Sequence, residues 1–215
     1  MRTIINFNEN WLFIKDTADI SRRDGESVSP PHCWNATDGQ DGGNDYFRGT
    51  AYYEKKLVKA DFPEADRYYL EIRGANSSAD VYLNGKHLAH HDGGYSTWRV
   101  DITETLEREN LFAIVVNNEA NEIVYPQMAD FTFYGGLYRD VNIICVNESH
   151  FDLDYYGSPA IMVTPKIKGA DAEIEIETFF KNEDWFSNFR LDRFKKTRFT
   201  WLRKSRFYGL IGTLY

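Results

Sequence analysis

Apolar and polar residues alternate with a period of two along most of the chain, and sustained helical periodicity is almost absent. In residues 67–73, the alternation places Tyr68, Leu70 and Ile72 on one face and the residues between them on the other. A strand with one face on a core and the other in water has this pattern. We therefore predict a half-buried β-strand at residues 67–73.

A β-hairpin is predicted at residues 79–89. Residues 79–83 alternate in the same way and run directly into Asn84-Gly85. This dipeptide readily adopts the positive φ angles that a type I′ turn requires, and residues 86–89 supply the returning strand.

Two stretches are apolar at most positions. Residues 111–116 are apolar on both faces, which predicts a central strand covered on two sides, and residues 141–146 follow in the same manner. Short strands separated by turn residues are typical of all-β folds. We predict an all-β chain whose first part is a jelly-roll β-sandwich.

The pattern changes near residue 150. Residues 150–159 are interpreted as a connector, and residues 161–165 and 172–180 as two further strands. Two strands alone are at best marginally stable in water, so the sequence predicts the beginning of a second, incomplete sandwich. From residue 182 the chain becomes basic and aromatic without a clear period, which is typical either of a nucleic-acid or membrane-surface tail or of a frameshifted end. The abrupt loss of strand pattern favours the frameshift.

Charge is distributed unevenly over the 215 residues, whose net charge is −8. Residues 1–180 contain 16 Lys and Arg against 30 Asp and Glu, whereas residues 181–215 contain 9 against 3. An acidic body repels phosphate backbones, so we expect the main domain not to bind nucleic acid. Aromatic residues make up 16% of the chain and provide flat faces on which sugar rings can stack.

The two cysteines, Cys33 and Cys145, are too few for a disulfide-built scaffold, and we expect two reduced, packed thiols. No apolar run approaches the roughly 20 residues that cross a bilayer. The first residues lack the basic segment and long apolar core of a signal peptide. These features predict a cytoplasmic chain without a membrane partner.

Residues 130–141 are the stretch most indicative of function, because Asp130, three aromatic residues and Gly135-Gly136 lead directly into an arginine-led strand. A carboxylate can accept paired hydrogen bonds from vicinal sugar hydroxyls, and flanking aromatic rings would exclude water from them. The alternative is a turn-forming aspartate, with Arg139 and Asp140 simply pairing on the sheet surface.

With Pro30-Pro-His-Cys-Trp-Asn35 and residues 79–95, this stretch resembles the N-terminal sugar-binding domain of family 2 glycoside hydrolases, the β-galactosidase and β-glucuronidase group. The resemblance implies a jelly roll at residues 1–148, the start of an immunoglobulin-like domain at 149–181 and an atypical tail at 182–215. It also implies a truncated enzyme, inactive by itself, whose two catalytic glutamates lie on a missing (β/α)8 barrel. Three alternating glutamates, at positions 173, 175 and 177, are interpreted as solvated surface instead. Cys33 stands where the family has an acid.

The same resemblance implies that Asp130 contacts the hydroxyls of a β-galactoside-like sugar and, in a complete enzyme, helps to hold a sodium ion. It nominates Arg48 as a second sugar contact, the alternative being an ion pair with Asp45 or Glu54. The histidines at 87, 90 and 91 lack further ligands at zinc spacing, so no other metal or cofactor is expected.

Two other classes of function stay open. An autonomous carbohydrate-binding module shares the sandwich and its aromatic faces, and would bind sugar without a partner. A structural domain that docks on a barrel or another subunit would instead expose a large apolar patch and self-associate. The oligomeric state and the identity of the glycoside do not follow from the sequence.

Overall fold

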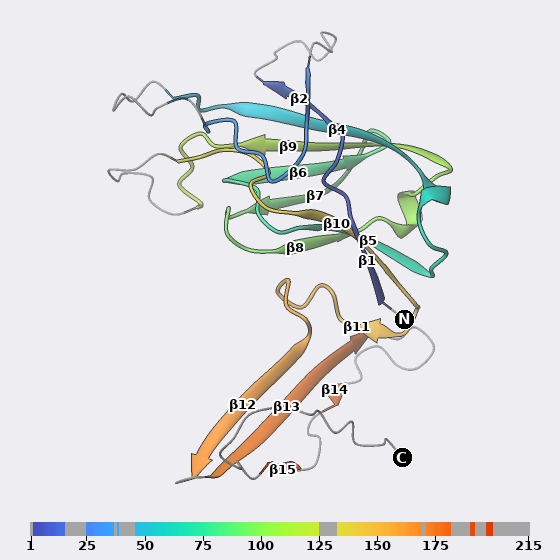
Figure 1. The fold of residues 1–215 in the computed structure, drawn as a ribbon, viewed down its shortest axis with the longest axis vertical. Coiled ribbons are helices and arrows are strands. Elements are labelled where there is room, and N and C mark those ends of the chain that lie inside the picture. The colour runs from blue at the N-terminus through green and yellow to red at the C-terminus, as the bar shows by residue number, and fades with distance from the viewer. Residues whose placement is uncertain are drawn as a thin grey trace.

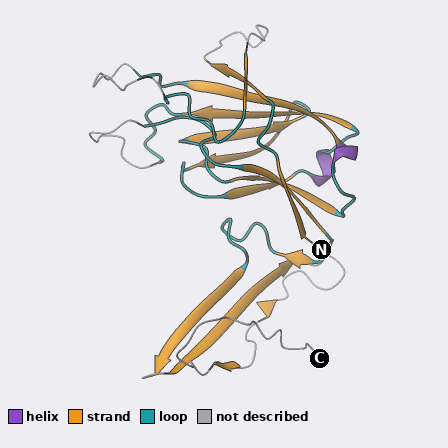
Figure 2. Cartoon of the chain, viewed as in Figure 1, coloured by secondary structure: helices purple, strands orange, loops and turns teal. Residues whose placement is uncertain are grey.

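The computed structural model describes residues 2–15, 25–36, 38, 46–124, 133–168 and 171–181, and the backbone of 190–191 and 197–199. Two antiparallel sheets stack on each other, with a long hairpin extending from one end (Figure 1). The predicted all-β class and jelly-roll sandwich are confirmed. Among the described residues, the only helical segments are two 3-10 turns, η1 (Lys59–Asp61) and η2 (Thr103–Thr105) (Figure 2). Within this part of the chain, no helix is long and apolar enough to cross a membrane.

One layer is a six-stranded sheet. Its strands lie in the order β3 (Glu26–Val28), β2 (Trp11–Lys15), β4 (Thr50–Val58), β9 (Glu109–Asn117), β6 (Ser78–Leu83), β7 (Lys86–Asp92). The predicted hairpin is β6–β7, and its turn residues Asn84 and Gly85 have φ angles of 53° and 79°. The central position predicted for residues 111–116 is confirmed in β9. The prediction that both faces of this strand are covered is only partly correct. The other sheet covers the face of β9 that carries Phe112, Ile114 and Val116, and the opposite face is only partly buried.

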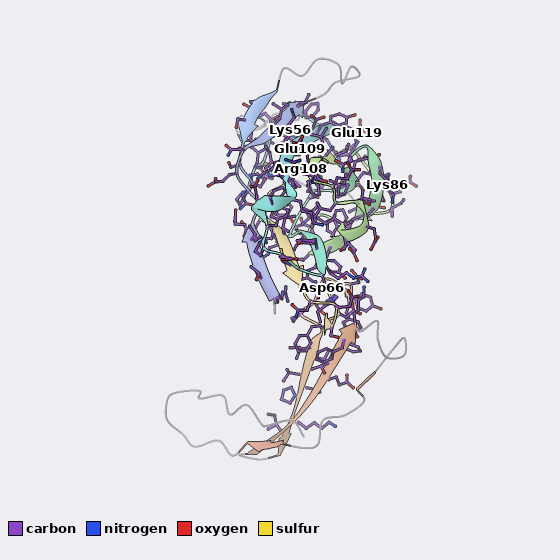
Figure 3. All side chains as sticks on the ribbon, turned by 90° about the vertical axis from the view of Figure 1, so that its right-hand side faces the viewer. Lys56, Asp66, Lys86, Arg108, Glu109 and Glu119 are labelled. Atoms are coloured by element: carbon purple, nitrogen blue, oxygen red, sulfur yellow. The ribbon has the colours of Figure 1, made fainter. Side chains whose placement is uncertain are left out.

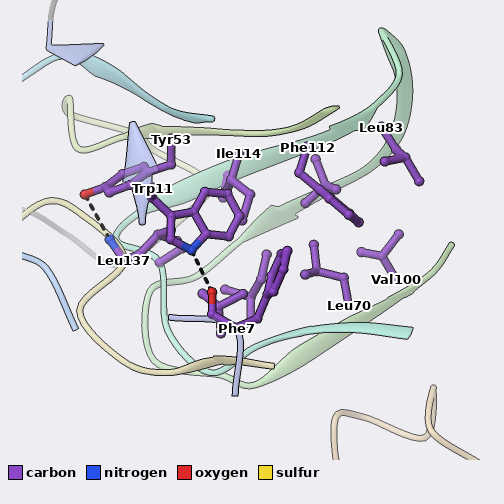
Figure 4. Close-up of a cluster of buried hydrophobic side chains, with 14 of the residues drawn as sticks. Phe7, Trp11, Tyr53, Leu70, Leu83, Val100, Phe112, Ile114 and Leu137 are labelled. Atoms are coloured by element: carbon purple, nitrogen blue, oxygen red, sulfur yellow. Dashed lines mark hydrogen bonds between the residues drawn. The ribbon is translucent and has the colours of Figure 1, made fainter. Parts of the chain in front are cut away.

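The second layer is a four-stranded sheet in the order β1 (Arg2–Asn6), β10 (Val141–Val146), β5 (Arg67–Ile72), β8 (Trp98–Asp101). Aromatic and aliphatic side chains together fill the space between the layers (Figure 4). Trp11 is fully buried, and its indole Nε1 donates a 2.8 Å hydrogen bond to the carbonyl of Phe7. The edge of the Phe7 ring meets the rings of Trp11 and Phe112, at centroid distances of 5.4 and 5.7 Å. Edge-to-face contacts of this kind favour one arrangement of the core.

The connector at residues 152–160 packs on the outer face of the four-stranded sheet. Leu153 is 1% exposed and lies in a cluster with Tyr69, Ile144 and Val146. The expectation that the outward residues of 67–73 meet water is therefore wrong for Tyr69 and for Glu71, both of which are buried. The cause is tertiary, because the covering segment lies about eighty residues further along the chain.

The third sheet contains β11 (His150–Phe151), β12 (Ile161–Lys168) and β13 (Asp171–Lys181). The two strands predicted at 161–165 and 172–180 are confirmed, and they pair as an antiparallel hairpin. Two short strands, β14 (Arg190–Leu191) and β15 (Thr197–Phe199), pair with β13. Most of residues 182–215, to which the tail prediction refers, lies outside the described residues.

Candidate functional site

The loop that enters β10 is held at one end of the sandwich by backbone hydrogen bonds from two other segments of the chain. The amide nitrogen of His32 donates to the carbonyl of Leu137 at 2.7 Å, and that of Trp34 donates to Gly135 at 3.3 Å. The amide nitrogen of Asn76 donates to Gly136 at 3.1 Å. We call residues 133–139 the rim. Two of the sequence stretches that carried the family resemblance therefore meet in space.

The glycine pair of the rim is required by close packing. A Cβ atom on Gly135 would lie 2.0 Å from Cζ2 of Trp34, which is far inside van der Waals contact. Gly136 has a φ of +125°, and a Cβ there would lie 2.4 Å from the carbonyl oxygen of His32. Only glycine adopts this backbone without strain or clash.

Two fully buried asparagines, Asn35 and Asn118, satisfy the backbone groups of the rim. The amide of Gly135 donates to Asn35 Oδ1 at 2.8 Å, and Asn118 Nδ2 donates to the carbonyl of Phe133 at 3.0 Å. Asn118 Oδ1 accepts from the amide of Gly49 at 2.8 Å. Sequence reasoning missed Asn118, because an asparagine just after a strand is equally typical of an exposed turn. Its role depends on long-range contacts.

Arg48, nominated as a sugar contact, lies next to the rim. Its Nε donates to the carbonyl of Asn118 at 3.1 Å, and its guanidinium lies 5.3 Å from the centroid of the Phe133 ring. Phe133 follows Asp130 by three positions. Asp130 itself, with the sodium ion predicted beside it, lies outside the described residues, as does Asp45. The contacts of Arg48 place a cation beside the ring of Phe133.

Arg139 and Asp140 each have partners on other elements. Arg139 Nη1 donates to the carbonyl of Tyr95 at 2.8 Å. Asp140 accepts from Asn8 Nδ2 at 2.9 Å and lies 3.6 Å from Arg73 Nη1. These contacts fix the strand end next to the rim, so the simple pairing of Arg139 with Asp140 is not what orders it.

A neutral hydrogen-bonded pair lies behind the rim. His32 Nδ1 and the Tyr53 hydroxyl are 2.9 Å apart. Burial lowers the pKa of His32 and raises the pKa of Tyr53, so both groups stay uncharged near neutral pH. This pair supports the rim without supplying a charge for acid–base chemistry.

The histidines of the β6–β7 hairpin make local contacts. Asp80 Oδ1 accepts from His87 Nε2 at 2.8 Å and from His90 Nδ1 at 3.0 Å, and the His91 ring stacks on Trp98. In the described part of the chain, no group of three or more His, Cys, Asp or Glu could hold a metal ion. The two cysteines are free, as predicted.

Comparison with known proteins identifies the fold of the rim-bearing sandwich. The family model "Glycosyl hydrolase 2 galactose-binding domain-like" matches residues 44–139. The sandwich is a galactose-binding-like domain of glycoside hydrolase family 2. It is 34% identical over 166 residues to a β-glucuronidase of Bacteroides fragilis, a match that covers 76% of this chain and 23% of that enzyme. A β-galactosidase of Thermoanaerobacter pseudethanolicus is 28% identical over 188 residues, covering 82% and 24%.

Solved structures agree with this family 2 assignment. An FMN-binding β-glucuronidase from Faecalibacterium prausnitzii superposes with a TM-score of 0.78 at 45% identity, covering 86% of this chain and 29% of that one. A β-glucuronidase from Bacteroides uniformis gives 0.76 at 31% identity, covering 85% and 22%. The chain thus spans between a fifth and a third of the length of these relatives, and corresponds to their N-terminal galactose-binding-like domain.

Proposed function

We propose that this family 2 domain forms one wall of a carbohydrate pocket in a longer glycoside hydrolase that acts on terminal β-glycosides. The observation that carries the proposal is the buried amide network of the rim. Asn118 binds the loop that follows Asp130 and, through its own carbonyl, orients Arg48. A rigid support of this kind is what a binding group needs if it is to keep its geometry without a ligand.

The chemistry of the proposed wall suits a sugar. Asp130 would accept hydrogen bonds from two vicinal hydroxyls, while Arg48 would donate to hydroxyl or ring oxygens. Tyr134 on the rim is 47% exposed and would offer a ring face. The acidic charge of residues 1–180 favours a neutral sugar over a uronic acid, so we propose a β-galactoside rather than a β-glucuronide.

Hydrolysis itself would belong to the longer protein. Retaining glycosidases need two carboxyl groups about 5 to 5.5 Å apart, and the proposal assigns both to another domain. We therefore expect no turnover by this chain alone. A sodium ion enters the proposal only in the complete enzyme, where Asp130 would supply one carboxylate ligand.

A second candidate, an autonomous carbohydrate-binding module, is favoured by the fact that the rim is ordered by contacts within this chain. It predicts tighter binding, because no second wall is missing. Saturable submillimolar affinity of the chain for lactose would support this module, whereas the one-wall proposal predicts a dissociation constant in the millimolar range or weaker.

The FMN of the F. prausnitzii enzyme is a property of that protein. Among the described residues, two shallow hollows of about 440 and 480 Å³ lie at the turns near Arg108 and Glu109. Figure 3 labels these two residues. Each hollow has both cations and carboxylates, the first having Lys59 and Arg108 beside Glu64 and Glu107. A phosphate group prefers an excess of positive charge, so these hollows do not fit FMN.

The proposed wall can be tested by NMR titration of the ¹⁵N-labelled chain with lactose and with glucuronate. We expect lactose to shift rim signals near Arg48 and Tyr134, and Asp130→Asn to reduce its affinity by about tenfold or more, as a charged hydrogen bond is lost. Asp61→Asn, at the η1 turn, is the matched control. Rim signals that do not respond to lactose, or respond equally in Asp130→Asn, would contradict the proposal.

A further inference from the structure

A row of exposed tyrosines extends from the rim to the connector. Tyr134 is 47% exposed, Tyr95 62% and Tyr156 89%. We propose that this tyrosine row is an extended binding surface for a neutral oligosaccharide whose terminal sugar occupies the rim. The inference rests on the proposed function and adds that the substrate is a chain of sugars rather than a small glycoside.

Contacts between the segments that carry the three tyrosines show that these segments adjoin one another. The side chain of Asn76 donates to the carbonyl of Tyr134 and lies against Gly94, where an added Cβ would meet its Oδ1 at 2.3 Å. The β7–β8 loop then continues through Tyr95 to Thr97. The carbonyl oxygen of Thr97 lies 1.8 Å from where a Cβ on Gly157 would be, so this loop touches the connector. In Figure 1 the connector lies beneath the four-stranded sheet, at the end of β12 that is nearest the sandwich.

The connector presents Tyr156 rigidly. The amide of Ser158 donates to the carbonyl of Tyr155 at 2.9 Å, which closes a tight turn with Tyr156 and Gly157 at its tip. Buried Arg99 holds both sides of this turn, because its Nη1 donates to the carbonyls of Leu153 and Ser158. Tyr156 has a φ of 50°, which is costly for a residue with a bulky side chain.

The ring of Tyr156 is supported from behind. Its edge meets the Tyr155 ring at a centroid distance of 5.0 Å, and Tyr155 stacks on Phe179 at 4.0 Å. Strained backbone conformations cluster at binding sites, and here the strained residue carries an exposed ring that other rings support.

The surroundings of the row favour sugar over an apolar protein partner. Exposed polar residues, namely Ser96, Arg139 and Asp154, lie next to the tyrosines in sequence or in space, so the rings do not merge into one apolar patch. A pyranose has an apolar face of C–H groups and a rim of hydroxyls, which matches ring faces separated by polar groups. A neutral oligosaccharide is not repelled by the negative charge of the domain.

The test is isothermal titration of the full 215-residue chain with β-1,4-galactohexaose and with lactose. We expect the hexasaccharide to bind about tenfold or more tightly than lactose, since it adds two stacking contacts. Tyr95→Ala and Tyr156→Ala should each weaken hexasaccharide binding about three- to tenfold and leave lactose unchanged. Tyr156→Phe, which keeps the ring, should bind like the parent, and Tyr82→Ala on the outer sheet face is the matched control.

Equal affinity for the two sugars, an equal loss for both in the tyrosine variants, or no heat with about 10 mM hexasaccharide would each overturn the inference. Failure of the proposed function has a different signature. In that case Asp130→Asn would not weaken lactose binding, whatever the tyrosine variants do to the hexasaccharide. Tyr95 and Tyr156 lie outside the core, so loss of binding in their alanine variants would not reflect unfolding.

Discussion

Glu71 Oε2 accepts a 2.7 Å hydrogen bond from Arg99 Nε on the neighbouring strand, and the two side chains are only 2% and 6% exposed. Glu71 also accepts from Asn142 Nδ2 at 3.1 Å and from Arg73 Nε at 3.0 Å. Because Arg99 in turn binds the connector backbone, this buried ion pair joins the sandwich to the segment that carries Tyr156.

Arg99→Ala is expected to destabilise the chain by about 3 kcal/mol or more, since it leaves a buried carboxylate without its main partner. Urea unfolding followed by tryptophan fluorescence measures this change. Arg73→Ala is the control, because Arg73 is 44% exposed and its loss should cost about 1 kcal/mol or less. Equal decreases in the free energy of unfolding of the two variants would show that the buried Glu71–Arg99 pair stabilises the chain no more than an exposed ion pair does.

The stability that Glu71 contributes should disappear in acid. Burial raises the pKa of Glu71, but hydrogen bonds from Arg73 and Arg99 outweigh this effect and hold the pKa below its ordinary value. The contribution is therefore fully present above the unfolded-state pKa of about 4.3 and is lost as the pH falls through the lower folded-state value. Urea midpoints of the parent and Glu71→Gln should differ at pH 7 and converge as the pH falls through the lowered folded-state pKa of Glu71. A difference that stays constant with pH would refute this assignment.

Gly135→Ala should destabilise the rim by about 3 kcal/mol, because the new methyl group would overlap the Trp34 ring. Gly85→Ala is the control, because it introduces backbone strain without a steric clash. Gly85 has a φ of +79° but no atom within 4 Å of an added Cβ, so its replacement should cost about 1 kcal/mol. Thermal unfolding of both variants tests the comparison, and a smaller loss for Gly135→Ala than for Gly85→Ala would contradict the geometry of the rim.

Two neighbouring histidines should titrate in opposite directions. A hydrogen bond to Asp80 raises the pKa of His90, whereas burial lowers the pKa of His91. The contribution of His90 to stability is therefore present below an unfolded-state pKa of about 6.5 and is lost as the pH rises through the folded-state value. Two-dimensional NMR of the imidazole signals should give a higher midpoint for His90 than for His91, and Asp80→Asn should lower the former. A lower titration midpoint for His90 than for His91 would show that the contact of His90 with Asp80 and the burial of His91 do not persist in solution.

Local features of the fold were predictable from the sequence, and long-range ones were not. The hairpin depends on Asn84-Gly85 and a few residues on either side, so both the hairpin and the position of its turn were predicted correctly. The burial of Glu71 depends on the connector, which the alternation of its own strand cannot reveal. Among the candidate site residues, the family resemblance nominated Arg48, whose contact with a sugar stays a prediction. Asn118 was missed, since its importance comes from contacts with Phe133 and Gly49.

The central claim is that Asp130 faces a sugar pocket on the rim. A crystal structure of the chain soaked with methyl β-D-galactopyranoside tests it most directly. The account predicts the Asp130 carboxylate beside Arg48 and Phe133, accepting hydrogen bonds of about 2.7 Å from two sugar hydroxyls. A carboxylate turned into the protein interior, with both oxygens satisfied by protein donors and no sugar at the rim, would contradict it.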